Sequence, residues 1–147
     1  ALVARTRSQL AGIAQALTLY KLQYGDYPQT EKAKELFDAL TGKMGPKRDK
    51  VDPPGKTLLA NLSHFDVSHP EALTESTMGT NELLDSWGNP YHYVYKVPEQ
   101  SWLNPSYLLW SDGIDGVSKT VYNEKGFLSE DASSGENADN IYEPAIQ

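Results

Sequence analysis

The sequence predicts a single α+β domain over residues 1–147, with a long N-terminal helix packed on a small antiparallel sheet. Three observations lead to this fold class. An apolar stripe of helical period runs through residues 2–24, two β-rich runs lie between residues 91 and 110, and prolines and glycines interrupt much of the remaining chain. With 39% hydrophobic residues, the chain has enough apolar surface for one modest core.

Composition excludes several classes of function. The net charge of −7 leaves no basic surplus to neutralise phosphates, so we expect no nucleic-acid partner. The chain has no cysteine, which excludes disulfides, thiolate zinc ligands and cysteine nucleophiles. It has no apolar run of about 18 residues that would cross a bilayer. It begins in what looks like the middle of a helix, and we therefore expect a preceding segment.

The first predicted element is a helix over residues 2–24. Its apolar side chains recur at steps of three or four, which places them on one face: Leu10, Ile13, Leu17, Tyr20 and Tyr24. Gly25 is a typical helix stop, and Pro28 favours an extended chain beyond it. We expect this stripe to face the core.

A shorter helix is predicted from Glu31 to Leu40, with Thr30 as its N-cap. Residues 43–82 are interpreted as a variable insertion. Within it, lysines and Arg48 are diluted by acidic neighbours, which favours a solvated loop over an anion-binding patch. The apolar segment around residues 58–67 is compatible with either a helix or a strand. Residues 68–81 are expected to be irregular.

The predicted sheet begins as an antiparallel hairpin. Its strands are Tyr91–Val97 and Tyr107–Trp110, rich in aromatic and branched side chains, and Pro98 and Pro105 interrupt the long connection between them. A tight turn over residues 85–90 precedes the first strand. After the second strand we expect a short strand over residues 117–122, a turn at 123–126 and a loop over 130–137.

The segment SDGIDG, residues 111–116, is a candidate cation site. It places Asp112 and Asp115 beside flexible glycines, and calcium takes six to eight oxygen ligands from carboxylates and carbonyls. The spacing is not that of an EF-hand, and spacing alone leaves a calcium loop and a solvated turn both open. The three histidines lack the HExxH spacing of a zinc site.

Several of these segments together resemble the major pseudopilin of type II secretion, a member of the type IV pilin-like family. SWGNPYHY (residues 86–93) and SDGIDG are similar to its DPWGNPY and SxGxDG motifs. The family's helix exit, YxxxxGxYP, is matched by Tyr20, Gly25, Tyr27 and Pro28. The likeness covers residues 5–28 and 84–141.

The resemblance implies a structural subunit and no enzyme. In that family an upstream apolar segment of about 20 residues anchors the subunit in the inner membrane and begins with a methylated residue after prepilin cleavage. Subunits then assemble with one another and with other pseudopilins, through this helix, into a periplasmic filament that supports protein export. A minor pseudopilin or a type IV pilin is an alternative within the same fold.

The resemblance also implies a calcium site. Carried over by position, its ligands are the carboxylates of Asp115 and Asp139 and the carbonyl oxygen of Asp112. This sequence departs from the family pattern where Asp112 replaces an apolar residue, Ser86 replaces a proline, and Asn140 separates Asp139 from the following isoleucine. The Asp112 side chain would therefore add a ligand or cap the turn.

One interpretation from another class is a secreted calcium-dependent domain that binds or hydrolyses carbohydrate. It would use the acidic loop together with Trp87, Trp102 and Trp110 as stacking platforms for sugar rings. Packing of these tryptophans in the core is the simpler prediction.

Overall fold

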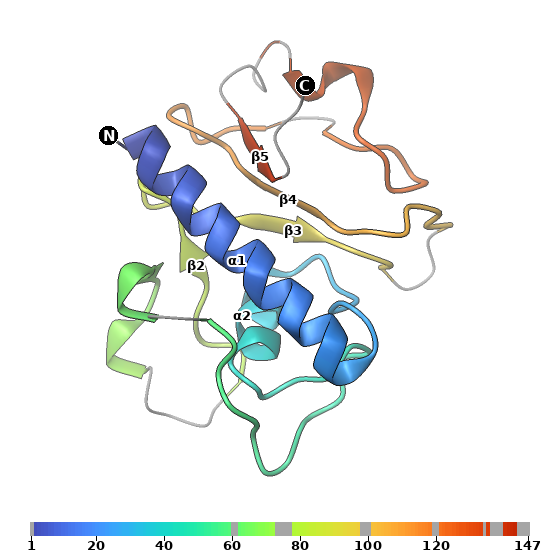
Figure 1. Cartoon of the computed structure of the whole chain (residues 1–147). Coiled ribbons are helices and arrows are strands. Elements are labelled where there is room, and N and C mark those ends of the chain that lie inside the picture. The colour runs from blue at the N-terminus through green and yellow to red at the C-terminus, as the bar shows by residue number, and fades with distance from the viewer. Residues whose placement is uncertain are drawn as a thin grey trace.

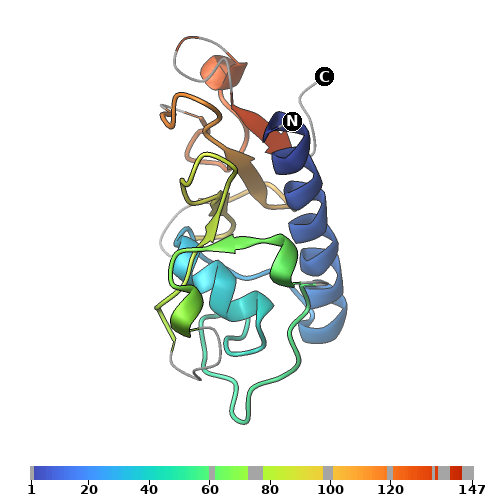
Figure 2. The same ribbon diagram turned by 90° about the vertical axis from the view of Figure 1, so that its left-hand side faces the viewer.

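A long helix and a three-stranded antiparallel sheet form the two main layers (Figure 1). The computed structural model describes residues 2–59, 62–72, 78–97, 101–118, 121–133, 135 and 140–143. Figure 2 shows α1 as a separate layer along one side of the molecule, and the helix contacts both β4 and β5. The predicted α+β class, with its long N-terminal helix and small antiparallel sheet, is confirmed.

The first helix, α1, spans Leu2–Tyr24, as predicted from its apolar period. Leu10, Ile13, Leu17 and Tyr20 are all at most 1% exposed, so these four residues of the predicted stripe face the core. Tyr24, the fifth, is half-buried and packs against the edge of the core. The helix ends at Gly25, whose φ of +90° is readily adopted only by glycine and whose N–H still bonds the Lys21 carbonyl.

The second helix, α2, spans Ala33–Leu40 and is shorter than predicted. The prediction of Thr30 as N-cap was wrong, because Lys32 occupies that position without a side-chain cap bond. The Thr30 carbonyl accepts a hydrogen bond from the N–H of Tyr95, and Lys32 is extended with ψ of 126°. The hydrogen bond between Tyr95 and Thr30, which lie far apart in the sequence, thus outweighs the local preference of Thr30 for the N-cap position.

The main sheet has the order β3-β4-β5, with His92–Val94, Leu108–Ser111 and Ile141–Glu143 as its strands. The predicted hairpin of β3 and β4 is confirmed, with His92 opposite Trp110. The first strand ends three residues earlier than predicted, because Tyr95 bonds Thr30 and Lys96 has a φ of +40°. The third strand, β5, was not predicted.

A second, two-stranded sheet pairs β1 (Asp66–Val67) with β2 (Leu83–Leu84) inside and beside the predicted insertion. Short 3₁₀ turns cover residues 62–64 and 70–72. The turn at 70–72 agrees with the irregular structure expected for residues 68–81, of which 73–77 lie outside the described residues. The segment around 58–67, for which helix and strand were both possible, contains a 3₁₀ turn and the strand β1 in its described part. Among the described residues, no helix has both the length and the apolar character of a membrane-spanning segment.

The C-terminal part differs from two predictions. The predicted strand over 117–122 is wrong for its described residues. Residues 117 and 118 are not in a strand, because the N–H of Val117 bonds the Asp115 carboxylate, and of residues 121 and 122 only Tyr122 forms a bridge, to Leu128. Residues 119 and 120 lie outside the described residues. The predicted turn at 123–126 is confirmed by the hydrogen bond from the Gly126 N–H to the Asn123 carbonyl. The predicted loop over 130–137 begins instead with a 3₁₀ turn at Glu130–Ser133.

Buried tyrosines connect the helix exit to the sheet. The Tyr93 hydroxyl donates to the Pro28 carbonyl at 2.7 Å, and the Tyr95 hydroxyl donates to Asp26 Oδ1 at 2.8 Å. Tyr27 packs edge-on against Tyr95, at 5.5 Å between ring centroids. The segment that ends α1 is thereby held on the strand that follows 65 residues later.

Candidate functional site

The turn before β3 and the loop after β4 lie against each other, and they form the candidate site. Ser111, at the end of β4, donates its hydroxyl hydrogen bond to Asp85 Oδ2 at 2.6 Å, and both side chains are buried. Beside this bond, a Cβ added to Gly116 would lie 2.9 Å from Asn89 Nδ2, so the loop packs closely on the turn. The two predicted motif segments are therefore in direct contact.

Asp85 organises the turn itself. Its carboxylate is 1% exposed, and Oδ1 accepts the N–H groups of both Trp87 and Asn89 at 3.0 Å. The Asp85 N–H in turn bonds the Asn89 carbonyl at 2.7 Å. A buried carboxylate is tolerated only when hydrogen bonds satisfy it, and here two backbone amides and one hydroxyl do so.

The outer face of this turn also contacts α1. Ser86 bonds Thr6 through the two hydroxyl groups at 2.8 Å, and the Tyr91 hydroxyl donates to Gln9 Oε1 at 2.6 Å. Thr6 and Gln9 are buried, which the apolar period of the helix did not predict. Side-chain hydrogen bonds from Thr6 and Gln9 thus join the N-terminal half of α1 to the turn and to the residue that follows it.

Asp112 turns its carboxylate toward β3. It is 6% exposed, and its Oδ2 lies 2.7 Å from His92 Nε2, while the His92 ring stacks on Trp110 at 5.0 Å between centroids. Burial by itself raises the pKa of Asp112, but hydrogen bonds from His92, Ser118 and Trp110, together with the charge of His92, outweigh it and hold this pKa below its ordinary value. Oδ1 of the same carboxylate is buried, and the side chains that approach it form no hydrogen bond of standard geometry with it.

Asp115 lies at the exposed side of the same loop. Its Oδ1 accepts the Val117 N–H at 2.9 Å, which closes a small local turn. Neighbouring Ile114 is 74% exposed. The structure therefore brings Asp112 and Asp115 into one loop but orients their carboxylates differently, and Asp139 lies outside the described residues. In the part of the chain that the structure describes, no three acidic or histidine side chains form a metal-binding group.

The atoms in this loop that could coordinate an ion suit a hard cation. Apart from the His92 ring, they are carboxylate and carbonyl oxygens, and Asp112 Oδ1 is a buried acceptor without a hydrogen bond of standard geometry. The Asp112 carbonyl and the Asp115 carboxylate are the oxygens in this loop that the resemblance implies as calcium ligands.

The tryptophans lie inside an aromatic cluster. Trp102 is 9% exposed and Trp110 is 5% exposed, and both pack against Tyr122 at 6.1–6.3 Å between ring centroids. Their ring faces are consequently covered by the protein, whereas carbohydrate stacking requires exposed faces. The prediction that they pack in the core is confirmed for these two residues.

Comparisons of this chain with protein-family models, with characterised proteins and with solved structures found no match.

Proposed function

We propose that this chain is the globular domain of a pseudopilus subunit of type II secretion, a structural protein without catalytic activity. The observation that supports the proposal is the contact between Asp85 and Ser111, 26 residues apart. This bond joins two of the three segments on which the resemblance rests. Antiparallel pairing of β3 with β4 brings both segments to one end of the hairpin, and the bond then links their side chains in the protein interior.

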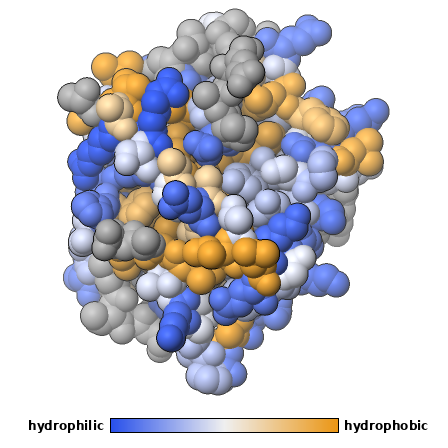
Figure 3. Space-filling model, in the orientation of Figure 1, coloured by the Kyte–Doolittle hydropathy of each residue, from blue (hydrophilic) through white to orange (hydrophobic). Residues whose placement is uncertain are grey.

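The outer face of α1 is the surface on which assembly would take place. Leu19 is 49% exposed and Leu22 is 78% exposed, on the side of the helix that faces away from the sheet. Figure 3 shows apolar surface along the C-terminal half of α1, to which both leucines belong. Burial of such side chains between subunits stabilises an assembly. An upstream apolar segment would anchor each subunit in the inner membrane, and the domain would lie in the periplasm.

Cross-linking of the full-length protein in its own cells tests this proposal. The chain has no cysteine, so Val3→Cys with Leu22→Cys introduces the only two thiols into this domain, at exposed positions near the two ends of α1. With a short bis-maleimide, we expect a ladder of covalent oligomers on a denaturing gel, because neighbouring subunits in a filament bring these helices together.

The matched control places the two thiols at exposed positions outside α1, with Lys50→Cys and Glu124→Cys. This pair should give a much weaker ladder with the same reagent. Only monomers from the α1 pair, in cells that export protein normally, would contradict assembly through this helix.

Calcium is the proposed ligand of the loop over residues 111–116, with Asp115 and Asp139 as carboxylate ligands. An ion that binds only the folded protein stabilises it by mass action, and we expect the melting temperature to be higher in calcium than in chelator. Asp115→Ala should abolish most of this difference. Glu124→Ala removes an exposed carboxylate outside the loop and should leave the difference intact.

The calcium measurement is a thermal melt of each variant in both solutions. A difference between calcium and chelator that persists in Asp115→Ala would remove this residue from the ligand set. If the melting temperature of the wild type were the same in calcium and in chelator, calcium would be removed from the proposal. The proposal of a filament subunit does not depend on this result.

A further inference from the structure

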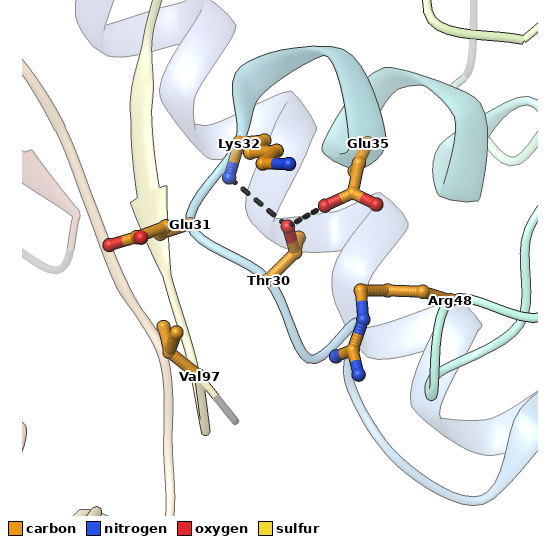
Figure 4. A pocket seen from close by; sticks show the side chains of 6 residues that line it. All are labelled: Thr30, Glu31, Lys32, Glu35, Arg48 and Val97. Carbon is orange, nitrogen blue, oxygen red and sulfur yellow. Dashed lines mark hydrogen bonds between the residues drawn. The ribbon is translucent and has the colours of Figure 1, made fainter. Parts of the chain in front are cut away.

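A hollow of about 320 Å³ lies beside the start of α2, at the opposite end of the β3–β4 hairpin from the candidate calcium loop. Figure 4 shows its wall, which comes from three separate segments of the chain. The lining residues are Thr30, Glu31, Lys32, Glu35, Arg48 and Val97. This volume is at the lower end of the range of small-molecule sites.

Backbone hydrogen bonds hold the three segments together. The Gln29 N–H donates to the Pro46 carbonyl at 2.8 Å, and the Tyr95 N–H donates to the Thr30 carbonyl at 3.1 Å. The residues that precede α2 are thus joined to the loop of Arg48 on one side and to the end of the hairpin strand on the other. The wall of the hollow is built before any ligand arrives.

A buried hydroxyl orients the acidic side of the hollow. Thr30 is 2% exposed, and its hydroxyl donates to Glu35 Oε1 at 2.6 Å while accepting the Lys32 N–H at 3.1 Å. Figure 4 shows the Glu35 carboxylate turned toward Thr30. This bond uses one side of one carboxylate oxygen, and the other acceptor positions of Glu35 remain for a cationic group.

Arg48 forms the basic side. Its backbone has a φ of +66°, a region that residues other than glycine rarely adopt, and its Nη1 donates to the Gln29 carbonyl at 2.6 Å. The guanidinium group has five N–H donors in one plane, and the residues that the structure describes accept from only this one. Unusual backbone conformations of this kind concentrate at binding sites.

The charges around the hollow do not neutralise one another. Within the described part of the chain, the ion pairs within 4.0 Å join other residues, and none involves Glu31, Lys32, Glu35 or Arg48. Two carboxylates and two cations therefore surround the hollow, with Val97 as its apolar side chain. A ligand that carries both charges can satisfy both sides together.

We propose that this hollow binds a small zwitterion of the amino-acid or short-peptide class. The ligand carboxylate would bind the Arg48 guanidinium, because its planar donors match the two oxygens of a carboxylate. The ligand ammonium would bind Glu35, and the methylene groups between them would contact Val97. This site is independent of the proposed filament, since it uses neither the outer face of α1 nor the loop over residues 111–116.

An NMR titration of the ¹⁵N-labelled chain with glycylglycine tests the proposal. We expect saturable shifts of the amides of residues 29–35, 47–48 and 95–97, with a dissociation constant on the order of 1 mM. Acetate alone and methylammonium alone should each bind at least tenfold more weakly. Comparison of glycine with glycylglycine distinguishes a free amino acid from the end of a peptide.

Two variants assign the binding to the opposite charges. Arg48→Gln and Glu35→Gln should each weaken glycylglycine binding at least tenfold, and Glu35→Gln keeps an oxygen acceptor for Thr30. Lys47→Gln removes an exposed neighbouring cation outside the hollow and should bind as the wild type does. The proposal is overturned if glycylglycine gives no saturable shift, if acetate reproduces it, or if Glu35→Gln binds unchanged.

Discussion

Asp85→Ala is expected to lower the free energy of unfolding by about 3–5 kcal/mol. The substitution leaves the Ser111 hydroxyl and the N–H groups of Trp87 and Asn89 without their acceptor, and the site is closed to compensating water because Asp85 is 1% exposed. Each hydrogen bond to a buried charge contributes about 1.5–3 kcal/mol, and bonds that share one carboxylate are not additive. The loss therefore exceeds that of any single bond.

Urea unfolding followed by tryptophan fluorescence measures this effect. Asp85→Asn keeps an oxygen acceptor and should cost less than Asp85→Ala. Ser111→Ala removes the bond to Asp85 and the bond that the Ser111 hydroxyl accepts from the Gly113 N–H, but it leaves both amide bonds of Asp85 intact and should cost about 1–3 kcal/mol. Glu124→Ala, at an exposed carboxylate, should be close to neutral. If Asp85→Ala were as stable as Glu124→Ala, the turn and the loop would not depend on this carboxylate.

Leu17→Ala is expected to lower the free energy of unfolding by about 2–5 kcal/mol. Leu17 is fully buried in the middle of the stripe by which α1 packs on the sheet. Removal of its methyl groups loses their transfer free energy and leaves a cavity, which neighbours on two rigid elements fill only in part.

Leu22→Ala is the matched control, because it makes the same change on the same helix at a side chain that is 78% exposed. It should change the stability of the isolated domain by less than about 0.5 kcal/mol. The two variants are compared by equilibrium denaturation at equal protein concentration. A near-neutral Leu17→Ala would mean that this face of α1 does not stabilise the domain and is free for assembly.

The candidate site could be predicted in part. The residues 111–116 were predicted to form a loop with two aspartates, and the loop is present, but the direction of each carboxylate was not predictable. The Asp112 carboxylate contacts His92, which is 20 residues away in the sequence, and Asp85 bonds Ser111, which is 26 residues away. Pairing at such distances depends on strand register, which no local pattern encodes. The hollow beside α2 was missed for the same reason, since its lining comes from three segments.

Local signals in the sequence were enough to predict the long helix and the hairpin. The period of apolar residues predicts α1, Gly25 and Pro28 predict its end, and the β-rich runs predict the hairpin, because each signal lies within a few neighbouring residues. The start of α2, the end of β3 and the addition of β5 to the sheet depend on contacts between distant segments. In each case the deciding hydrogen bonds join distant segments, such as Tyr95 with Thr30, and the free energy of those contacts exceeds the weak local preference.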